Sequence, residues 1–150
     1  MLLKKHEDSI RGGSRVYLLN GALSIELLLK AIIVAKGKIA PKHHDLLDLA
    51  RNANVGYVAN QRATLELLTQ ILKWSGRYPV PNKEEDWQRY YDDVLEKHII
   101  REREANIGRA RANPETFPTI DNYQRLWNFA NLRWSEVVSG TNGGVQDGTN

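Results

Sequence analysis

One apolar segment dominates this sequence, the run from Ile25 to Val34, in which eight of ten residues are hydrophobic. Only Glu26 and Lys30 interrupt it, and they stand four residues apart in the order that favours an ion pair along a helix. The run is too short to span a bilayer, because a membrane-spanning helix needs about twenty apolar residues. It therefore predicts the central, buried helix of a folded domain, and we expect no membrane as a partner.

Capping and breaking residues place four more helices along the chain. Apolar periodicity, together with candidate caps and stops, predicts helices over about residues 15–36, 43–53, 60–75, 83–111 and 119–138. No strand pattern is visible, so the predicted fold is all-α, a four- to five-helix up-and-down bundle. We expect residues 1–138 to form one domain. Residues 139–150 have almost nothing to bury and are expected to form a flexible tail.

The composition excludes several classes of function. Lys and Arg number 21 against 18 Asp and Glu, an excess too small to indicate nucleic-acid binding by itself. The chain has no cysteine, which excludes disulfides, zinc fingers and thiol catalysis. It also lacks a phosphate-binding glycine loop, a nucleophile elbow and a zinc-protease motif. The first residues do not form a secretory signal, so we expect a cytoplasmic protein.

Two segments carry a resemblance to a known family. Residues 21–50, GALSIELLLKAIIVAKGKIAPKHHDLLDLA, combine small residues, an apolar helix with Glu and Lys, and a following His-Asp-Leu. This segment resembles the central helix pair of HEPN domains, and residues 74–80, WSGRYPV, are similar to a turn that is frequent in those proteins. The resemblance implies a helical bundle, commonly a homodimer, that binds RNA or a nucleotide. It also implies a role in bacterial toxin–antitoxin, defence or stress systems, where a nucleotidyltransferase-type protein is an expected partner.

The resemblance also implies a reaction that this chain is not equipped to perform in the usual way. Many HEPN proteins are metal-independent endoribonucleases in which an Arg holds the phosphate and a His, about four to six residues later, assists attack by the 2′-hydroxyl. None of the four histidines here follows an Arg at that spacing. The nearest counterpart is Arg125 followed by Asn131, and asparagine cannot act as a base near neutral pH. We therefore interpret the chain as a binding module rather than an enzyme.

Two other interpretations stay open. The first is a metal-independent endoribonuclease with a non-standard site, in which Arg125 would act together with His98 or with His44. The second is a dimeric scaffold or accessory subunit, because aromatic anchors suit protein interfaces, although they equally complete the core of a monomer. The interface would be the aromatic seam of the last predicted helix: Tyr123, Trp127 and Trp134.

Six polar residues form a candidate cluster for ligand binding or for structure: Glu26, Lys30, His44, Asp45, Arg77 and Tyr78. We expect His44 and Asp45 to cap a helix or to bond across to the central helix near Glu26. The alternative is a polar pocket that contacts a ligand. Arg77 and Tyr78 lie beside a proline and either shield an edge of the core or bind a base and a phosphate. The adjacent histidines point in different directions on a regular backbone, so we expect no metal and no cofactor.

The densest basic stretch runs from Lys97 to Arg111. Three glutamates are mixed with its five lysines and arginines when Glu96 is counted with it, which indicates a solvated helix face with ion pairs. The alternative is a stripe that binds phosphates.

Overall fold

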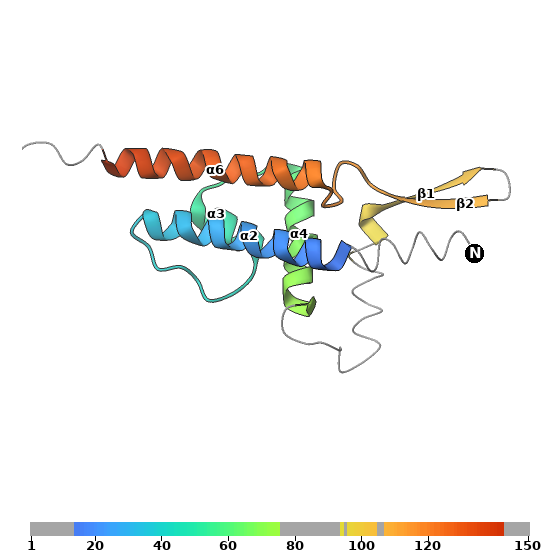
Figure 1. Ribbon diagram of the computed structural model, residues 1–150, viewed down its shortest axis with the longest axis horizontal. Coiled ribbons are helices and arrows are strands. Elements are labelled where there is room, and N and C mark those ends of the chain that lie inside the picture. The colour runs from blue at the N-terminus through green and yellow to red at the C-terminus, as the bar shows by residue number, and fades with distance from the viewer. Residues whose placement is uncertain (1–13, 76–93, 95, 105–106, 143–150) are drawn as a thin grey trace, which may run out of the picture.

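The structure, a computed structural model, describes residues 14–75, 94, 96–104 and 107–142. This part of the chain is mostly helical and carries one small two-stranded sheet (Figure 1). The elements are α2 (Ser14–Ala35), α3 (Leu46–Ala53), α4 (Ala59–Ser75), the 3-10 turn η2 (Glu96–His98), β1 (Ile99–Glu104), β2 (Ile107–Ala112) and α6 (Ile120–Asn142).

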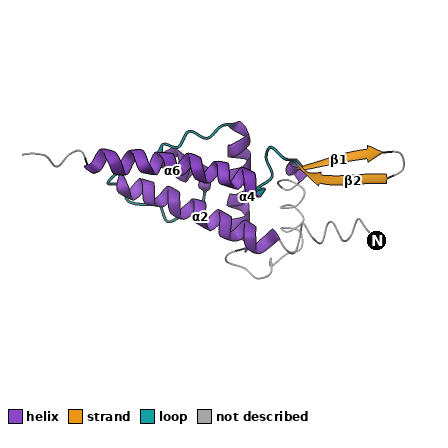
Figure 2. Ribbon diagram, turned by 45° about the horizontal axis from the view of Figure 1, so that its top comes forward, coloured by secondary structure: helices purple, strands orange, loops and turns teal. Residues whose placement is uncertain are grey.

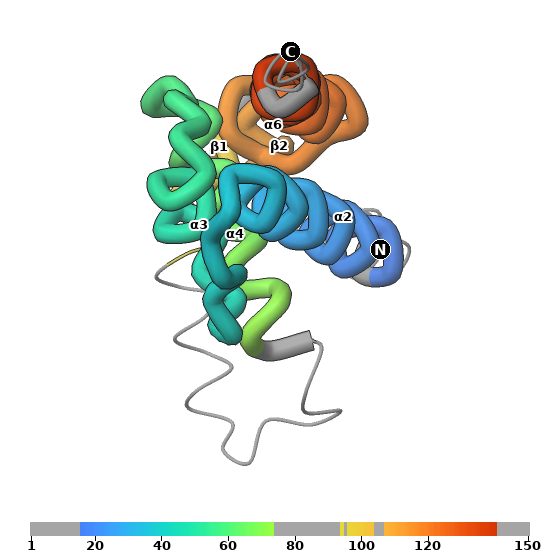
Figure 3. The backbone as a smooth tube through the Cα atoms, turned by 90° about the vertical axis from the view of Figure 1, so that its left-hand side faces the viewer, coloured from blue at the N-terminus to red at the C-terminus, as the bar shows by residue number. Residues whose placement is uncertain are grey.

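Helix α2 is the central element, because it packs against α3, α4 and α6. Helices α2 and α6 lie side by side, and α4 runs across them (Figure 1). Figure 3 views α6 end-on, with α2 beneath it and with α3 and α4 to one side. The helices therefore do not form the simple up-and-down bundle that we expected. Helix α3 has only eight residues, about 12 Å of length, so it cannot pair along the whole of α2.

Local capping chemistry explains where the first helices begin and end. Gly37 adopts φ +73°, a left-handed conformation that ends the helix α2. The Asp45 side chain accepts hydrogen bonds from the backbone N–H groups of Leu47 and Asp48 and so caps the start of α3. Asn54, at φ 59°, ends α3 in the left-handed region. Predicted and observed boundaries agree within one or two residues for α2 and α4, whereas α3 begins three residues later than expected.

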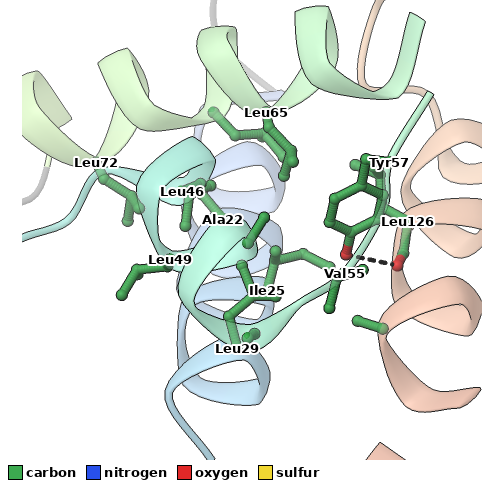
Figure 4. Packing of buried hydrophobic residues seen from close by; sticks show 14 of the residues in the cluster. Ala22, Ile25, Leu29, Leu46, Leu49, Val55, Tyr57, Leu65, Leu72 and Leu126 are labelled. Atoms are coloured by element: carbon green, nitrogen blue, oxygen red, sulfur yellow. Dashed lines mark hydrogen bonds between the residues drawn. The ribbon is translucent and has the colours of Figure 1, made fainter. Parts of the chain in front are cut away.

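The hydrophobic core lies between α2 and the three helices that contact it. Ile25, Leu29 and Ile32 of α2 are fully buried there. Figure 4 shows α2 residues facing side chains from α3, α4 and α6, with Tyr57 reaching from the connection between α3 and α4 to Leu126. The apolar run therefore forms the core helix that its composition predicts.

The opposite side of α2 carries four exposed apolar residues. Val16, Leu23, Leu27 and Val34 are spaced at helical intervals and are 69%, 40%, 67% and 57% exposed; we call them the α2 stripe. The stripe explains why the segment Val16–Ala35 is, by length and composition alone, apolar enough to cross a membrane. Core helices of soluble proteins pass the same test, and α2 has buried contacts on its other side, so this finding is weak support for a membrane segment.

The expectation of a helix up to Arg111 is wrong in its second half. The chain there forms η2 and an antiparallel hairpin in which Arg101 is opposite Ala110 and Arg103 is opposite Gly108. Figure 2 shows this hairpin projecting from the helical body. Arg and Glu alternate with a period of two in β1, and Gly108 is costly inside a helix. The fold is therefore not purely all-α. The first half of the predicted helix, residues 83–93, lies outside the described residues.

The last helix is longer than its apolar pattern indicates. Helix α6 continues through residues 139–142, which we expected to belong to a tail. The rest of that predicted tail, residues 143–150, lies outside the part of the chain that the structure describes.

Candidate functional site

A buried carboxylate on α2 is the centre of the candidate site. Glu26 is 5% exposed, and its Oε1 accepts a hydrogen bond from Lys30 Nζ at 2.6 Å. His44 Nδ1 lies 2.9 Å from the same oxygen and 3.0 Å from Oε2. Burial tends to raise the pKa of Glu26, but the hydrogen bonds from Lys30 and His44 and their positive charge outweigh it, so the pKa is lowered below its ordinary value of 4.5. Glu26 is therefore an anion at neutral pH.

Asp45, which we grouped with these residues, has a separate task. Its Oδ1 accepts hydrogen bonds from Leu47 N at 3.0 Å and from Asp48 N at 3.1 Å, as the cap of α3. The neighbouring His43 pairs with Asp48, with Nε2 3.0 Å from Oδ2. The structure thus brings together Glu26, Lys30 and His44, which we call the Glu26 cluster.

Sequence reasoning missed a residue that positions this cluster. Thr69 of α4 is 4% exposed, and its Oγ1 accepts a hydrogen bond from Leu46 N at 3.0 Å. This bond holds the start of α3 against α4, two residues after His44. Nothing in the sequence marks Thr69, because its role depends on how α4 packs.

The Glu26 cluster has a structural and a chemical capacity. As a structural unit it links α2 to the segment before α3 with satisfied charges. Chemically, the hydrogen bond between His44 Nδ1 and the Glu26 carboxylate fixes the ring of His44 in one orientation. The His44 side chain is 31% exposed, so a ligand can reach it. A carboxylate-oriented imidazole of this kind can act as a general base. Lys30, with 21% of its side chain exposed, adds a cation beside it.

His98 is buried at the base of the hairpin. It is 3% exposed, and its Nδ1 lies 3.0 Å from Thr116 Oγ1. The backbone oxygen of Thr116 accepts a hydrogen bond from Thr64 Oγ1 at 2.9 Å, so the contact reaches α4. Burial lowers the pKa of His98 below its ordinary value of 6.5. His98 is therefore a neutral residue that attaches the hairpin to the helical body.

Arg125 and Asn131 are both exposed on α6. In the part of the chain that the structure describes, no hydrogen bond or ion pair joins Arg125 to His98 or to His44. The side chains suggested for a non-standard ribonuclease site are thus not in direct contact within the described part of the chain.

The family model described as HEPN domain matches residues 11–104, more than half of the chain. This chain belongs to the HEPN domain family. The HEPN match includes α2, α3, α4 and β1, and therefore the whole Glu26 cluster. It ends before β2 and α6, so Arg125 and Asn131 lie beyond it. Neither the curated proteins nor the solved structures gave a significant match.

Two further candidate residues of this HEPN domain belong to the segment after α4. Arg77 and Tyr78 lie outside the described residues. Among the residues that are described, no group of three or more His, Asp and Glu is arranged to hold a metal ion.

The aromatic seam of α6 packs within the HEPN chain. Tyr123, Trp127 and Trp134 are partly buried against the core. The rings of Tyr17 and Tyr123 meet edge-to-face with centroids 6.2 Å apart, and an added Cβ on Gly21 would lie 3.2 Å from Tyr123. Tyr123 therefore joins α6 to α2. Exposed apolar residues lie on the α2 stripe and also on α6, at Ile120, Phe129 and Leu132.

Proposed function

We propose that this HEPN domain is a cytoplasmic binding module for RNA or a nucleotide in a bacterial toxin–antitoxin, defence or stress system, without the usual ribonuclease site. Membership of the HEPN family supports an RNA-related function in general. The observation that carries the finer proposal is on α6, where exposed Arg125 is followed by exposed Asn131 and not by a histidine. Arginine retains the capacity to hold a phosphate, but asparagine cannot transfer the proton.

The three described histidines support the same proposal. His43 pairs with Asp48, His44 contacts Glu26, and His98 is buried beside Thr116. Each ring is therefore engaged in a contact away from Arg125, and the usual Arg-to-His site would need one of them beside that arginine.

The α2 stripe supports a homodimer as the working unit. Exposed apolar residues that gather on one side of a helix are typical of protein interfaces. A partner protein, such as one of the nucleotidyltransferase type, is the alternative occupant of the stripe.

Binding measurements test the proposal directly. We expect labelled single-stranded RNA or labelled ATP to bind the purified protein, with an affinity that falls as salt rises, because phosphate contacts release counterions. Arg125→Ala should weaken that binding, while Arg51→Ala, also an exposed helical arginine, serves as the matched control. If neither ligand binds at low salt, the proposal has to be abandoned.

A metal-independent endoribonuclease is the second candidate, because the Glu26 cluster orients an imidazole as a general base requires. Here His44 is the base, Glu26 positions its ring and Lys30 supplies a cation near the phosphate. RNA incubated with the protein in EDTA should then be cleaved, and His44→Asn should abolish cleavage. RNA that stays intact after long incubation excludes this candidate. It leaves the binding module and the scaffold, which ligand binding distinguishes.

A further inference from the structure

The two faces of the projecting hairpin differ in charge. Directly opposed residues of an antiparallel pair share a face, and faces alternate along each strand. One face, the arginine face, holds Ile99, Arg101, Arg103, Gly108, Ala110 and Ala112. The other, the mixed face, holds Ile100, Glu102, Glu104, Ile107, Arg109 and Arg111. All the acidic residues of the two strands thus belong to the mixed face.

The positive charge of the arginine face is available. Arg103 makes no ion pair with any described residue, and Arg101 pairs with Glu96 of η2. Exposed ion pairs are worth only about 0–1 kcal/mol, so Arg101 can exchange its partner for a phosphate. On the mixed face, in contrast, Arg111 Nε donates to Glu102 Oε1 at 2.8 Å. Arg109 of the mixed face has no ion pair with a described residue either, but the two glutamates of that face offset its two arginines. The net positive charge of the two strands therefore lies on the arginine face.

The arginine face is also sterically open. The residues opposite Arg103 and Arg101 are Gly108 and Ala110, and a Cβ added to Gly108 would meet nothing within 4 Å. The two arginines are successive residues on this face, so their Cα atoms lie about 7 Å apart along the strand. Small residues beside them let a bulky polyanion approach.

The pattern of charges argues against a second copy as the occupant. A two-fold axis that joins two β1 edges in antiparallel order places residues of the same face opposite each other. Arg101 and Arg103 would then meet arginines or Ile99, and Glu102 would meet glutamates or Ile100, so no arginine would lie opposite a glutamate. Like charges directly opposite destabilise a sheet. The open edge of β1 is thus protected against self-pairing, which is a common device at exposed edges.

Shape and composition favour a duplex over a single strand. The hairpin strands contain no aromatic residue, so they offer no platform on which unpaired bases stack. A two-stranded ribbon fits the major groove of B-form DNA, which is about 12 Å wide. The major groove of A-form RNA is deep and narrow and does not admit it.

We propose that the arginine face of the β1–β2 hairpin enters the major groove of duplex DNA, where Arg101 and Arg103 contact base edges and phosphates. The projection of the hairpin beyond the helices leaves room for the duplex (Figure 2). This activity goes beyond binding of RNA or a nucleotide and uses a different surface from Arg125.

A charge-matched pair of variants tests the inference. Arg101→Ala/Arg103→Ala and Arg109→Ala/Arg111→Ala each remove two positive charges, but from opposite faces. By fluorescence anisotropy with labelled duplex DNA, we expect the arginine-face variant to lose at least about tenfold in affinity. The mixed-face variant should lose much less. An equal loss in both would show that net charge alone attracts DNA and would overturn the proposal.

A lysine variant and a duplex RNA test whether the fold of the hairpin or the type of duplex explains the result. Arg101→Lys/Arg103→Lys keeps the positive charge and is expected to keep the hairpin folded. If this variant binds DNA more tightly than the double alanine variant, the loss in the alanine variant comes from lost contacts. Circular dichroism checks that both variants are folded. Tighter binding of a duplex RNA of the same sequence would overturn the groove assignment. Failure to bind any duplex removes this inference alone, because single-stranded RNA and ATP test the proposed function separately.

Discussion

The hydroxyl of Tyr57 donates a hydrogen bond to the carbonyl oxygen of Leu126 at 3.0 Å. Tyr57 lies in the range that the HEPN family model matches, and Leu126 lies in α6, beyond it. The Tyr57 ring also packs on Phe129, with ring centroids 5.6 Å apart. Burial raises the pKa of Tyr57 far above its ordinary value, so the hydroxyl keeps its proton at every physiological pH. Helix α6 is therefore part of the same folded unit as the matched helices.

Removal of this hydroxyl should weaken the docking of α6. We expect Tyr57→Phe to lower the free energy of unfolding by about 1 kcal/mol, the usual net worth of one hydrogen bond. Urea denaturation measures the change. Tyr123→Phe is the control, because no hydrogen bond joins that hydroxyl to a residue that the structure describes, and it should change stability by less. Equal effects of the two substitutions would contradict the role given to Tyr57.

The close approach of α2 and α6 at Gly21 gives a second prediction. Because an added Cβ already lies 3.2 Å from the Tyr123 ring, Gly21→Val should overpack the contact and lower the free energy of unfolding by about 1–3 kcal/mol. Gly140 in α6 has nothing within 4 Å of such a Cβ. Gly140→Ala should therefore raise stability by up to about 1 kcal/mol through helix propensity. Thermal unfolding of both variants would show opposite shifts, and a gain for Gly21→Val would refute the close packing.

The buried His98 predicts a loss of stability in mild acid. Its pKa in the folded protein lies below the ordinary 6.5, so the unfolded chain binds the proton more readily. Burial of neutral His98 costs no protonation free energy above pH 6.5. The free energy of unfolding therefore falls as the pH drops from 6.5 toward the lower folded pKa of His98. Urea unfolding of the wild type across this window should show the decline. His98→Gln should flatten it, and an unaltered slope in this variant would count against the assignment.

Glu26 acts in a separate and more acidic window. Its folded pKa is lowered below 4.5, so the stability that its charge contributes is present above pH 4.5 and is lost as the pH falls through the folded pKa. At neutral pH, Glu26→Gln should cost about 1–3 kcal/mol, because it removes the charge from two hydrogen bonds. At acidic pH, below the folded pKa of Glu26, the variant and the wild type should converge. A constant difference across both conditions would mean that packing, and not charge, explains the loss.

What the sequence predicts well is local, and what it misses depends on pairing in space. The apolar period and the stop at Gly37 define α2, and the four-residue spacing predicts the Glu26–Lys30 contact. In β1 the same reasoning failed, because alternating Arg and Glu suit both a solvated helix and a strand. Gly108 was the signal that favoured the strand. The contact of His44 with Glu26 was expected only through the resemblance, and the bond from Leu46 to Thr69 follows from packing that no local pattern reports.

The α2 stripe yields the last prediction, which concerns assembly. Leu27 is 67% exposed at the centre of the stripe, so Leu27→Glu costs the isolated chain little. If two copies meet through the stripe, the substitution buries a charge without a partner, which an interface tolerates poorly. Sedimentation should then show a dimeric wild type and a monomeric variant with an unchanged circular dichroism spectrum. Ile39→Glu is the matched control, because Ile39 is 95% exposed and lies after α2; it should stay dimeric. A wild type that is monomeric at micromolar concentration would contradict a homodimer through the α2 stripe and would favour a partner protein as its occupant.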